Sequence, residues 1–265
     1  MMKDLEVWTV LFIADIVGKP GLDITARQLP ALREKYRPDL IIANGENGAN
    51  GKGLTEAIAK EYFELGIQLI TGGNHIWDNV DIYKIWQKDL RVLRPANYPA
   101  GNPGKGYLLV DLPDGAKAAV INLQGRTYLY SIECPFRVAD SILRHIHESA
   151  NFIVVDMHAE ATAEKMALAW HLDGRVSAVI GTHTHVQTAD ERILPQGTAY
   201  ITDAGMTGPF DSVIGMKTDT AIKRFMRQIP IRFEPATDNP RLCALVVRID
   251  KATAKAVSVE RLCIA

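Results

Sequence analysis

Two patterns of hydrophobic and polar positions alternate along the first half of the chain. Short continuous apolar runs, bounded by glycine and polar loops, are typical of buried strands in a largely parallel sheet. Longer segments with apolar residues three and four apart predict helices that cover such a sheet. The expected strands are residues 7–13, 40–43 and 67–71, and the expected helices are residues 22–36 and 55–65, the second capped by Thr55.

The second half of the chain combines the same succession with more strands. We expect helices at residues 136–149 and 160–170, and strands at residues 107–111, 118–123, 152–156, 176–180, 198–202, 231–234, 242–249 and 256–262. No repeat, low-complexity segment or convincing linker separates these elements, so residues 1–265 are predicted to form a single domain. Packed mixed sheets with outer helices, an α/β fold, are the architecture that this order favours.

Composition and charge narrow the classes of function. With 47% apolar residues in 265, the chain can bury a large core. Its 30 Lys and Arg against 31 Asp and Glu provide no broad basic surface for duplex nucleic acid. A function on a small anionic substrate is not excluded, because a bound metal would add positive charge to the site.

Cysteines and hydropathy bear on the compartment. The three cysteines are scattered and none lies in a CxxC pair, which favours a reducing environment and therefore the cytoplasm. The apolar stretch of residues 7–14 is far shorter than the roughly 20 residues of a membrane span, so no membrane association is expected.

Candidate chemistry gathers at the ends of five predicted strands. In open α/β sheets, ligands bind beyond the carboxyl ends of the strands, so these side chains are expected at one edge. They are Asp15, Glu46, Asn47, Asn74, His75, His158, His183 and His185. Oxygen and nitrogen ligands without sulfur suit Mn, Fe, Zn, Co or Ni.

Each of these signals is weak alone and stronger jointly. A strand-end aspartate is usually a turn or cap residue, and a lone histidine is usually a satisfied polar group. His183 and His185 are more specific, since side chains two apart on an extended segment point the same way. Convergence of five strand ends favours a metal site over a structural explanation. His145 and His147 are expected to be solvated, and His171 to cap a helix.

The order and spacing of Asp15, GNH at residues 73–75, His158 and GTHTH at residues 181–185 resemble the calcineurin-like metallophosphoesterases. That resemblance implies a four-layer α-β-β-α sandwich of two mixed sheets flanked by helices, with a two-metal centre at the strand ends. Longer strings resemble the bacterial YmdB-like branch, whose members are cyclic-nucleotide phosphodiesterases. These strings are NGEN at 44–47, RPAN at 94–97, NLQGR at 122–126, HAEAT at 158–162 and GTHTHVQTAD at 181–190.

Two departures from the broad family pattern bear on the metal. The broad pattern has Asp-x-His at the first strand, whereas this chain has Asp15-Ile16-Val17. Glu46 replaces the bridging aspartate, and Asn47 beside it can fill the vacant position. The YmdB-like branch shows the same two changes. The harder oxygen shell favours iron or manganese, with zinc and magnesium as alternatives.

The resemblance also implies a role for each candidate residue. Two divalent or mixed-valence metal ions are expected, with Glu46 as the bridging ligand. The first would be held by Asp15, Glu46, Asn47 and His185, and the second by Glu46, Asn74, His158 and His183. His75, which is not needed as a ligand, would protonate the leaving oxygen as general acid.

The resemblance leaves three functions to compare. The first is a phosphodiesterase that opens 2′,3′- or 3′,5′-cyclic nucleotides through a hydroxide that bridges two metals. A nucleotide phosphomonoesterase with the same centre and a nucleotide-binding regulatory sensor are the alternatives, and the retained His75 favours catalysis. Arg126 is a candidate phosphate contact, with a surface ion pair as its alternative role. We expect a small nucleotide substrate. The oligomeric state is left undecided, with a homo-oligomer as one alternative.

Overall fold

Two mixed β-sheets form the centre of the protein, in a computed structural model that describes residues 6–232 and 234–265. The first sheet runs β2 (Asp15–Ile16), β11 (Met206–Pro209), β12 (Pro240–Asp250), β1 (Val7–Ile13), β3 (Leu40–Asn44) and β4 (Leu69–Thr71), with β13 (Ala256–Ile264) paired to β12. The second runs β5 (Tyr107–Asp111), β6 (Lys117–Gln124), β7 (Phe152–His158), β8 (Ala178–Thr182), β10 (Ala199–Ile201) and β9 (Arg192–Ile193). Both sheets contain parallel and antiparallel pairs, such as β1 with β3 and with β12.

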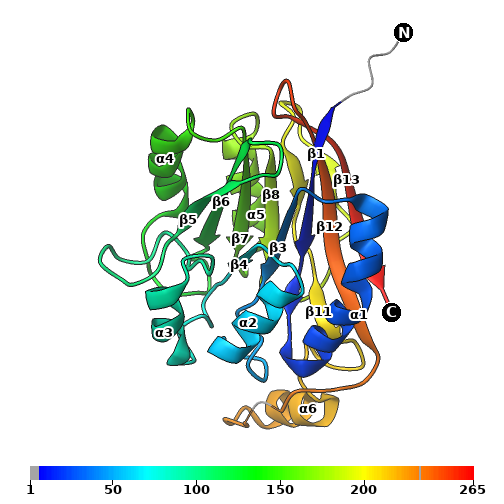
Figure 1. Ribbon diagram of the computed structural model, residues 1–265. Helices are drawn as coiled ribbons and strands as arrows, with labels where there is room; N and C mark the ends of the chain where they lie inside the picture. Colours follow the sequence, from blue (N-terminus) through cyan, green and yellow to red (C-terminus); the bar gives the residue numbers. More distant parts are fainter. Residues whose placement is uncertain (1–5, 233) are drawn as a thin grey trace.

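Helices cover the outer faces of the sheets (Figure 1). The core clusters place α1 (Gly18–Tyr36), α2 (Glu56–Glu64) and α3 (Asp81–Lys88) on the first sheet, and α4 (Pro135–Ile146) and α5 (Thr162–Leu172) on the second. The last helix, α6 (Thr218–Arg227), lies below the lower ends of the strands in the view of Figure 1. The predicted four-layer α-β-β-α fold is therefore confirmed.

The continuous apolar run of β1 is explained by burial on both of its faces. Val10 and Phe12 point into the core between the two sheets, whereas Leu11 and Ile13 point into the core beneath α1 and α2. All four are fully buried, and each such side chain contributes about 1.5–3 kcal/mol relative to an exposed position. A strand with one solvated face would instead have alternated apolar and polar residues.

A polar contact joins the two sheets at the amino end of β1. Trp8 Nε1 and Lys251 Nζ both donate hydrogen bonds to Asp114 Oδ2, at 2.9 and 2.5 Å. Asp114 lies in the β5–β6 turn and Lys251 in the β12–β13 turn. This contact lies far from the carboxyl end of β1 and ties the sheets together there.

The sequence patterns located most elements but missed some. Residues 231–234 were expected to be a strand, which is wrong for the described residues 231, 232 and 234, while residue 233 lies outside the described part. Prolines at 230 and 235 bound this segment and disfavour regular pairing. Helices α3 and α6 were not predicted, and α1 begins four residues earlier than expected, at Gly18.

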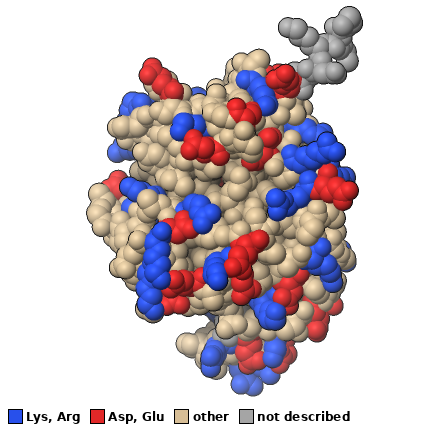
Figure 2. Space-filling view, in the orientation of Figure 1, with Lys and Arg blue, Asp and Glu red and all other residues tan. Residues whose placement is uncertain are grey.

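Charged side chains of both signs are mixed over the face seen in Figure 2. This distribution agrees with the near balance of 30 basic and 31 acidic residues. No helix among the described residues is long and apolar enough to cross a membrane.

Candidate metal centre and catalytic cavity

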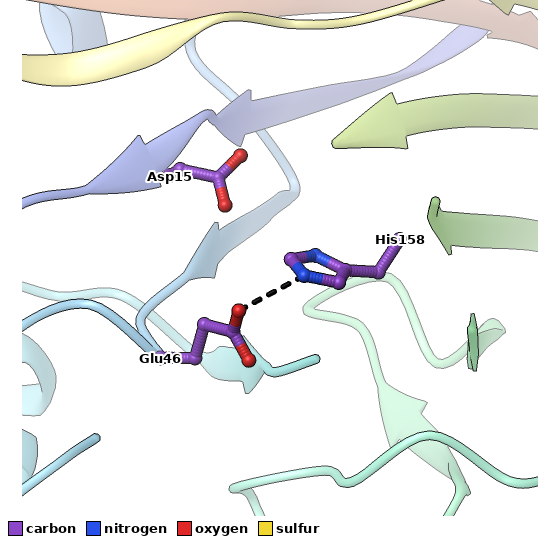
Figure 3. A group of neighbouring side chains, drawn as sticks. All are labelled: Asp15, Glu46 and His158. Carbon is purple, nitrogen blue, oxygen red and sulfur yellow. Dashed lines mark ion pairs between the residues drawn. The ribbon is translucent and has the colours of Figure 1, made fainter. Parts of the chain in front are cut away.

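The carboxyl ends of the parallel strands bring the predicted ligands together. Asp15 follows β1, Glu46 follows β3 and His158 ends β7, so both sheets contribute. Each of these three side chains offers one ligand atom, and the three atoms lie within 4.8 Å of one another. Figure 3 shows the three side chains pointing toward a common centre. All three are fully buried.

Three other predicted ligands converge on one nitrogen of His158. Its Nε2 lies 2.9 Å from Glu46 Oε1, 3.0 Å from Asn74 Oδ1 and 3.1 Å from His183 Nδ1. One ring N–H can serve only one of these acceptors. Among the described residues Glu46 Oε1 has no well-aligned hydrogen-bond donor, although it is in ion-pair contact with His158. These are the four residues predicted to hold the second ion.

The remaining predicted ligands are gathered more loosely beside this group. Asn47 Nδ2 lies 3.5 Å from Asp15 Oδ1 and 3.3 Å from His185 Nε2, and His185 Nε2 lies 3.7 Å from Asp15 Oδ1. A cation would require Oδ1 of Asn47 instead of Nδ2, which rotation of the amide provides. Glu46 stands between the two groups, and its Oε2 accepts a hydrogen bond from the backbone of His75 at 2.9 Å.

Burial and charge shift the pKa values of these groups strongly. Burial raises the pKa of Asp15 well above its usual range, against the attraction of His158. Burial would also raise the pKa of Glu46, but His158 and two further histidines outweigh it and lower the pKa to about 2. Burial would lower the pKa of His158, yet Glu46 and other carboxylates raise it to about 9. Burial and His158 lower the pKa of His183 to about 3.

The donor set fits divalent cations. Asp15, Glu46, Asp156 and Asp203 are all fully buried within this region, and buried carboxylates are costly without compensating positive charge. The raised pKa of His158 indicates that the pocket stabilises positive charge at its centre. Converging oxygen and nitrogen acceptors, without sulfur, match the preferences of iron, manganese or zinc.

Residues outside the ligand set orient His158. Thr182 Oγ1 donates to Asp156 Oδ1 at 2.7 Å and lies 3.0 Å from His158 Nδ1, and Asn44 Nδ2 lies 3.4 Å from the same nitrogen. These contacts hold Nδ1 away from the cluster and leave Nε2 facing the other ligands. Gly73 packs against the ring, because a Cβ at residue 73 would lie 2.1 Å from His158 Cδ2.

The segment that carries His183 and His185 does not have the extended geometry that we expected. Their φ angles are 97° and 62°, in the left-handed region, which costs roughly 1–3 kcal/mol for a residue with a side chain. Asp203 Oδ2 holds the segment by accepting from the backbone N–H and the hydroxyl of Thr184, at 3.1 and 2.7 Å. The same oxygen accepts from Lys165 Nζ at 2.6 Å, and both members of this ion pair are fully buried.

Carboxylates also contact His183 and His75 on the sides that face away from the ligand cluster. Glu160 Oε2 lies 3.0 Å from His183 Nε2, the ring nitrogen that points away from His158. Asp78 Oδ2 lies 2.9 Å from His75 Nδ1, which leaves Nε2 of His75 available for another partner. Neither carboxylate was singled out from the sequence, because acidic residues in loops are common and their partners are set by the fold.

A cavity of about 590 Å³ opens over these groups. One side is formed by Glu46, Asn47, His75, His183 and His185. The rest of the lining includes α6 and the segment before it, with Ile214, Met216, Ala221, Arg224 and Phe225. The cavity therefore places the candidate ligands and His75 against a wall that the sequence did not predict.

Several other candidate residues lie outside this cavity. Arg126 is on the exposed loop after β6, and its backbone N–H donates to Glu164. Arg94 is buried, and its guanidinium donates to three loop carbonyls, of Pro95, Asn102 and Pro103. Substrate contact by Arg126 stays a prediction. The surface histidines have other contacts: His145 Nδ1 lies 2.6 Å from a backbone carbonyl, and His171 Nε2 lies 2.9 Å from Asp140.

Comparisons with known proteins place this site in context. The family model described as YmdB-like protein matches residues 11–262. A 2′,3′-cyclic-nucleotide 2′-phosphodiesterase of Bacillus subtilis is 51% identical over 255 residues, 96% of each chain. A crystal structure of a hypothetical protein from Thermus thermophilus has a TM-score of 0.90 at 41% identity, covering 96% of this chain and 98% of that one. A novel phosphatase of Mycoplasma pneumoniae has a TM-score of 0.92 at 34% identity, covering 98% and 94%.

Proposed function

Because the chain belongs to the YmdB-like family, we propose that it is a metal-dependent phosphodiesterase that hydrolyses 2′,3′-cyclic nucleotides. The observation that carries the proposal is the position of His75. It lines the same cavity as Glu46, Asn47, His183 and His185, and Asp78 contacts its other ring nitrogen. Among the relatives, the Bacillus subtilis protein supports the cyclic diester as the substrate.

The proposed metal ligands divide as the family resemblance implies. Asp15, Asn47 and His185 would hold one ion, Asn74, His158 and His183 the other, and Glu46 would contribute one oxygen to each. When bound, two cations at such a site supply positive charge that activates water and balances the charge on the phosphoryl oxygens. The two Glu46 oxygens are already directed apart, Oε1 toward His158 and Oε2 toward the backbone of His75.

His75 is proposed to move the proton that the leaving oxygen needs. As water adds to phosphorus and loses a proton to solvent, the bond from phosphorus to O2′ breaks, and O2′ takes a proton from Nε2 of His75, which solvent then returns to the ring. Asp78 accepts a hydrogen bond from Nδ1 and fixes the orientation of the ring. The side chain of His75 is 28% exposed, so its ring is accessible from the cavity while it contacts Asp78.

Turnover of matched esters tests this proposal. Protein reconstituted with Mn²⁺ should hydrolyse 2′,3′-cyclic AMP and bis-p-nitrophenyl phosphate faster than p-nitrophenyl phosphate. Adding 3′,5′-cyclic AMP to the panel tests the second diester class. Hydrolysis of monoesters together with inertness toward every cyclic nucleotide would overturn the proposal. That result would favour the phosphomonoesterase alternative, which the phosphatase from Mycoplasma pneumoniae supports.

A further inference from the structure

The part of the cavity lining that α6 provides carries an exposed aromatic side chain. Phe225, on α6, is 70% exposed and lines the cavity. Its neighbours Ile222 and Met226 are also exposed but do not line the cavity. An exposed ring that faces a catalytic cavity offers a surface on which a nucleobase can stack, because every base has a π-face.

Two cationic side chains line the cavity together with Phe225: Arg224, on α6, and Lys52, on the loop after β3. Lys52 and Arg224 both line the cavity, and neither forms an ion pair within the part of the chain that the structure describes. Two other cations of this region are paired: Lys223 Nζ lies 3.3 Å from Asp219, and Lys217 Nζ lies 3.1 Å from Glu234. Neither of these two lysines lines the cavity. Unpaired cations beside a cavity attract an anionic part of a ligand.

A second hollow adjoins the first at Lys52. It has a volume of about 580 Å³ and is lined by Asn50, Lys52, Arg232, Glu234 and Pro235. Lys52 therefore borders both hollows, and Arg232 lies on the far one. Figure 2 shows basic and acidic side chains together on the lower protrusion, where Figure 1 places α6.

We propose that Phe225, Lys52 and Arg224 recognise a nucleoside 2′,3′-cyclic phosphate that carries a further phosphate on its 5′ side. Phe225 stacks on the base, while Lys52 and Arg224 bind the second phosphate. This inference rests on the proposed function, in which the cyclic phosphate occupies the metal centre. Lys52 and Arg224, which form no ion pair among the described residues, are then free to bind that second phosphate.

Matched substrates separate the two sources of that phosphate. The panel is adenosine 2′,3′-cyclic phosphate, its 5′-phosphorylated form, and the dinucleotide ApA that ends in a 2′,3′-cyclic phosphate. A charge-assisted contact predicts a preference of roughly 10- to 100-fold in kcat/KM for a 5′-phosphorylated substrate at low salt. Preference for the dinucleotide identifies an RNA end, and preference for the 5′-monophosphate identifies a mononucleotide.

Substitutions in the wall test the residues. K52Q and R224Q should each reduce the preference for the 5′ phosphate, and K223Q is the control because Lys223 is on the same helix but outside both hollows. F225A should raise KM for all three nucleotides by roughly 5- to 100-fold and change kcat far less, because stacking binds the base and takes no part in bond breaking. I222A is its control. Calorimetric binding of adenosine 3′,5′-bisphosphate gives the same comparison without turnover.

The outcomes distinguish failure of this inference from failure of the proposed function. Cyclic nucleotide turnover without any 5′-phosphate preference, unchanged in K52Q and R224Q, would overturn the inference and leave the function standing. Inertness toward all cyclic nucleotides would overturn the function. An F225A protein with unchanged KM and a lower molar mass by light scattering would show that α6 contacts a second copy and has no stacking role.

Discussion

The buried ion pair between Lys165 and Asp203 supports the segment that carries two candidate ligands, and Lys165→Met tests that support. Methionine keeps most of the length of the side chain and removes only the charged group. Asp203 would then be left buried, with hydrogen bonds from Thr184 and from the backbone of Gly205 but without its counter-charge.

The expected loss follows from the burial of both partners. Removing one partner of a fully buried pair typically costs about 3–5 kcal/mol. Asp203 keeps its other hydrogen bonds in this variant, so we expect the free energy of unfolding to fall by about 3 kcal/mol, near the lower end of that range. Lys19 provides the matched control, because its contact with Asp23 has almost the same length, 2.7 Å against 2.6 Å, but is exposed. An exposed pair contributes only about 0–1 kcal/mol, so Lys19→Met should be nearly silent.

Urea denaturation of the metal-free proteins measures these free energies of unfolding. Metal binding should fall in Lys165→Met as well, because Thr184 sits between two histidines whose backbones are strained and need the Asp203 contact. Titration of Mn²⁺ followed by calorimetry provides that second measurement. A destabilisation of less than about 1 kcal/mol, equal to that of Lys19→Met, would refute the idea that this pair supports the segment.

Three further predictions concern the site and the contact between the sheets. His75→Ala should retain its metal content but lose roughly 10²–10⁴-fold in kcat on a cyclic nucleotide, and far less on bis-p-nitrophenyl phosphate, whose leaving group needs no proton; equal losses on both esters would contradict the general-acid role. Wild-type protein reconstituted with metal should contain about two ions per chain by elemental analysis. Glu46→Gln should lower the occupancy of both positions together, since the shared carboxylate loses its charge. A wild-type content that never exceeds one ion would contradict a two-metal centre. The hydrogen bonds from Lys251 and Trp8 lower the pKa of Asp114 to about 2. The contribution of the ionised Asp114 to the free energy of unfolding is therefore complete above the unfolded carboxyl pKa of about 4, and it is lost as the pH falls through about 2. Asp114→Asn should therefore destabilise the protein at pH 7 in urea denaturation, with a difference from wild type that shrinks between pH 4 and 2; a constant difference would show that the charge is irrelevant.

Strand positions and strand-end ligands could be predicted because both depend on local sequence. An apolar run such as residues 40–43 is buried whichever strand pairs with it, and the polar residues that follow it must then leave the sheet at its edge. Glu46 and His158 were placed correctly at that edge by this argument alone. Their roles as metal ligands remain predictions that the geometry supports.

The parts that sequence could not provide depend on long-range partners. Lys165 belongs to a helix, where a charged residue is normally solvated, and its burial follows from Asp203, 38 residues away in sequence. Helix α6 has apolar residues at helical spacing, at positions 221, 222, 225 and 226, and it was overlooked in the sequence. What the sequence could not show is that Ile222, Phe225 and Met226 stay exposed and do not pack on a sheet. The left-handed backbone at His183 is imposed by contacts with Asp203 and Asp15, which no local motif encodes.

The contact between Gly73 and His158 has a consequence for how this protein tolerates mutation. Any replacement of this glycine introduces a Cβ, and that atom would lie 2.2 Å from His158 Nε2, the nitrogen on which the ligands converge. In a saturation mutagenesis experiment, residue 73 should therefore accept no other amino acid, as strictly as a metal ligand. Gly73 would then be scored as an essential residue although it has no functional group, because its role is to leave room for the ring of His158.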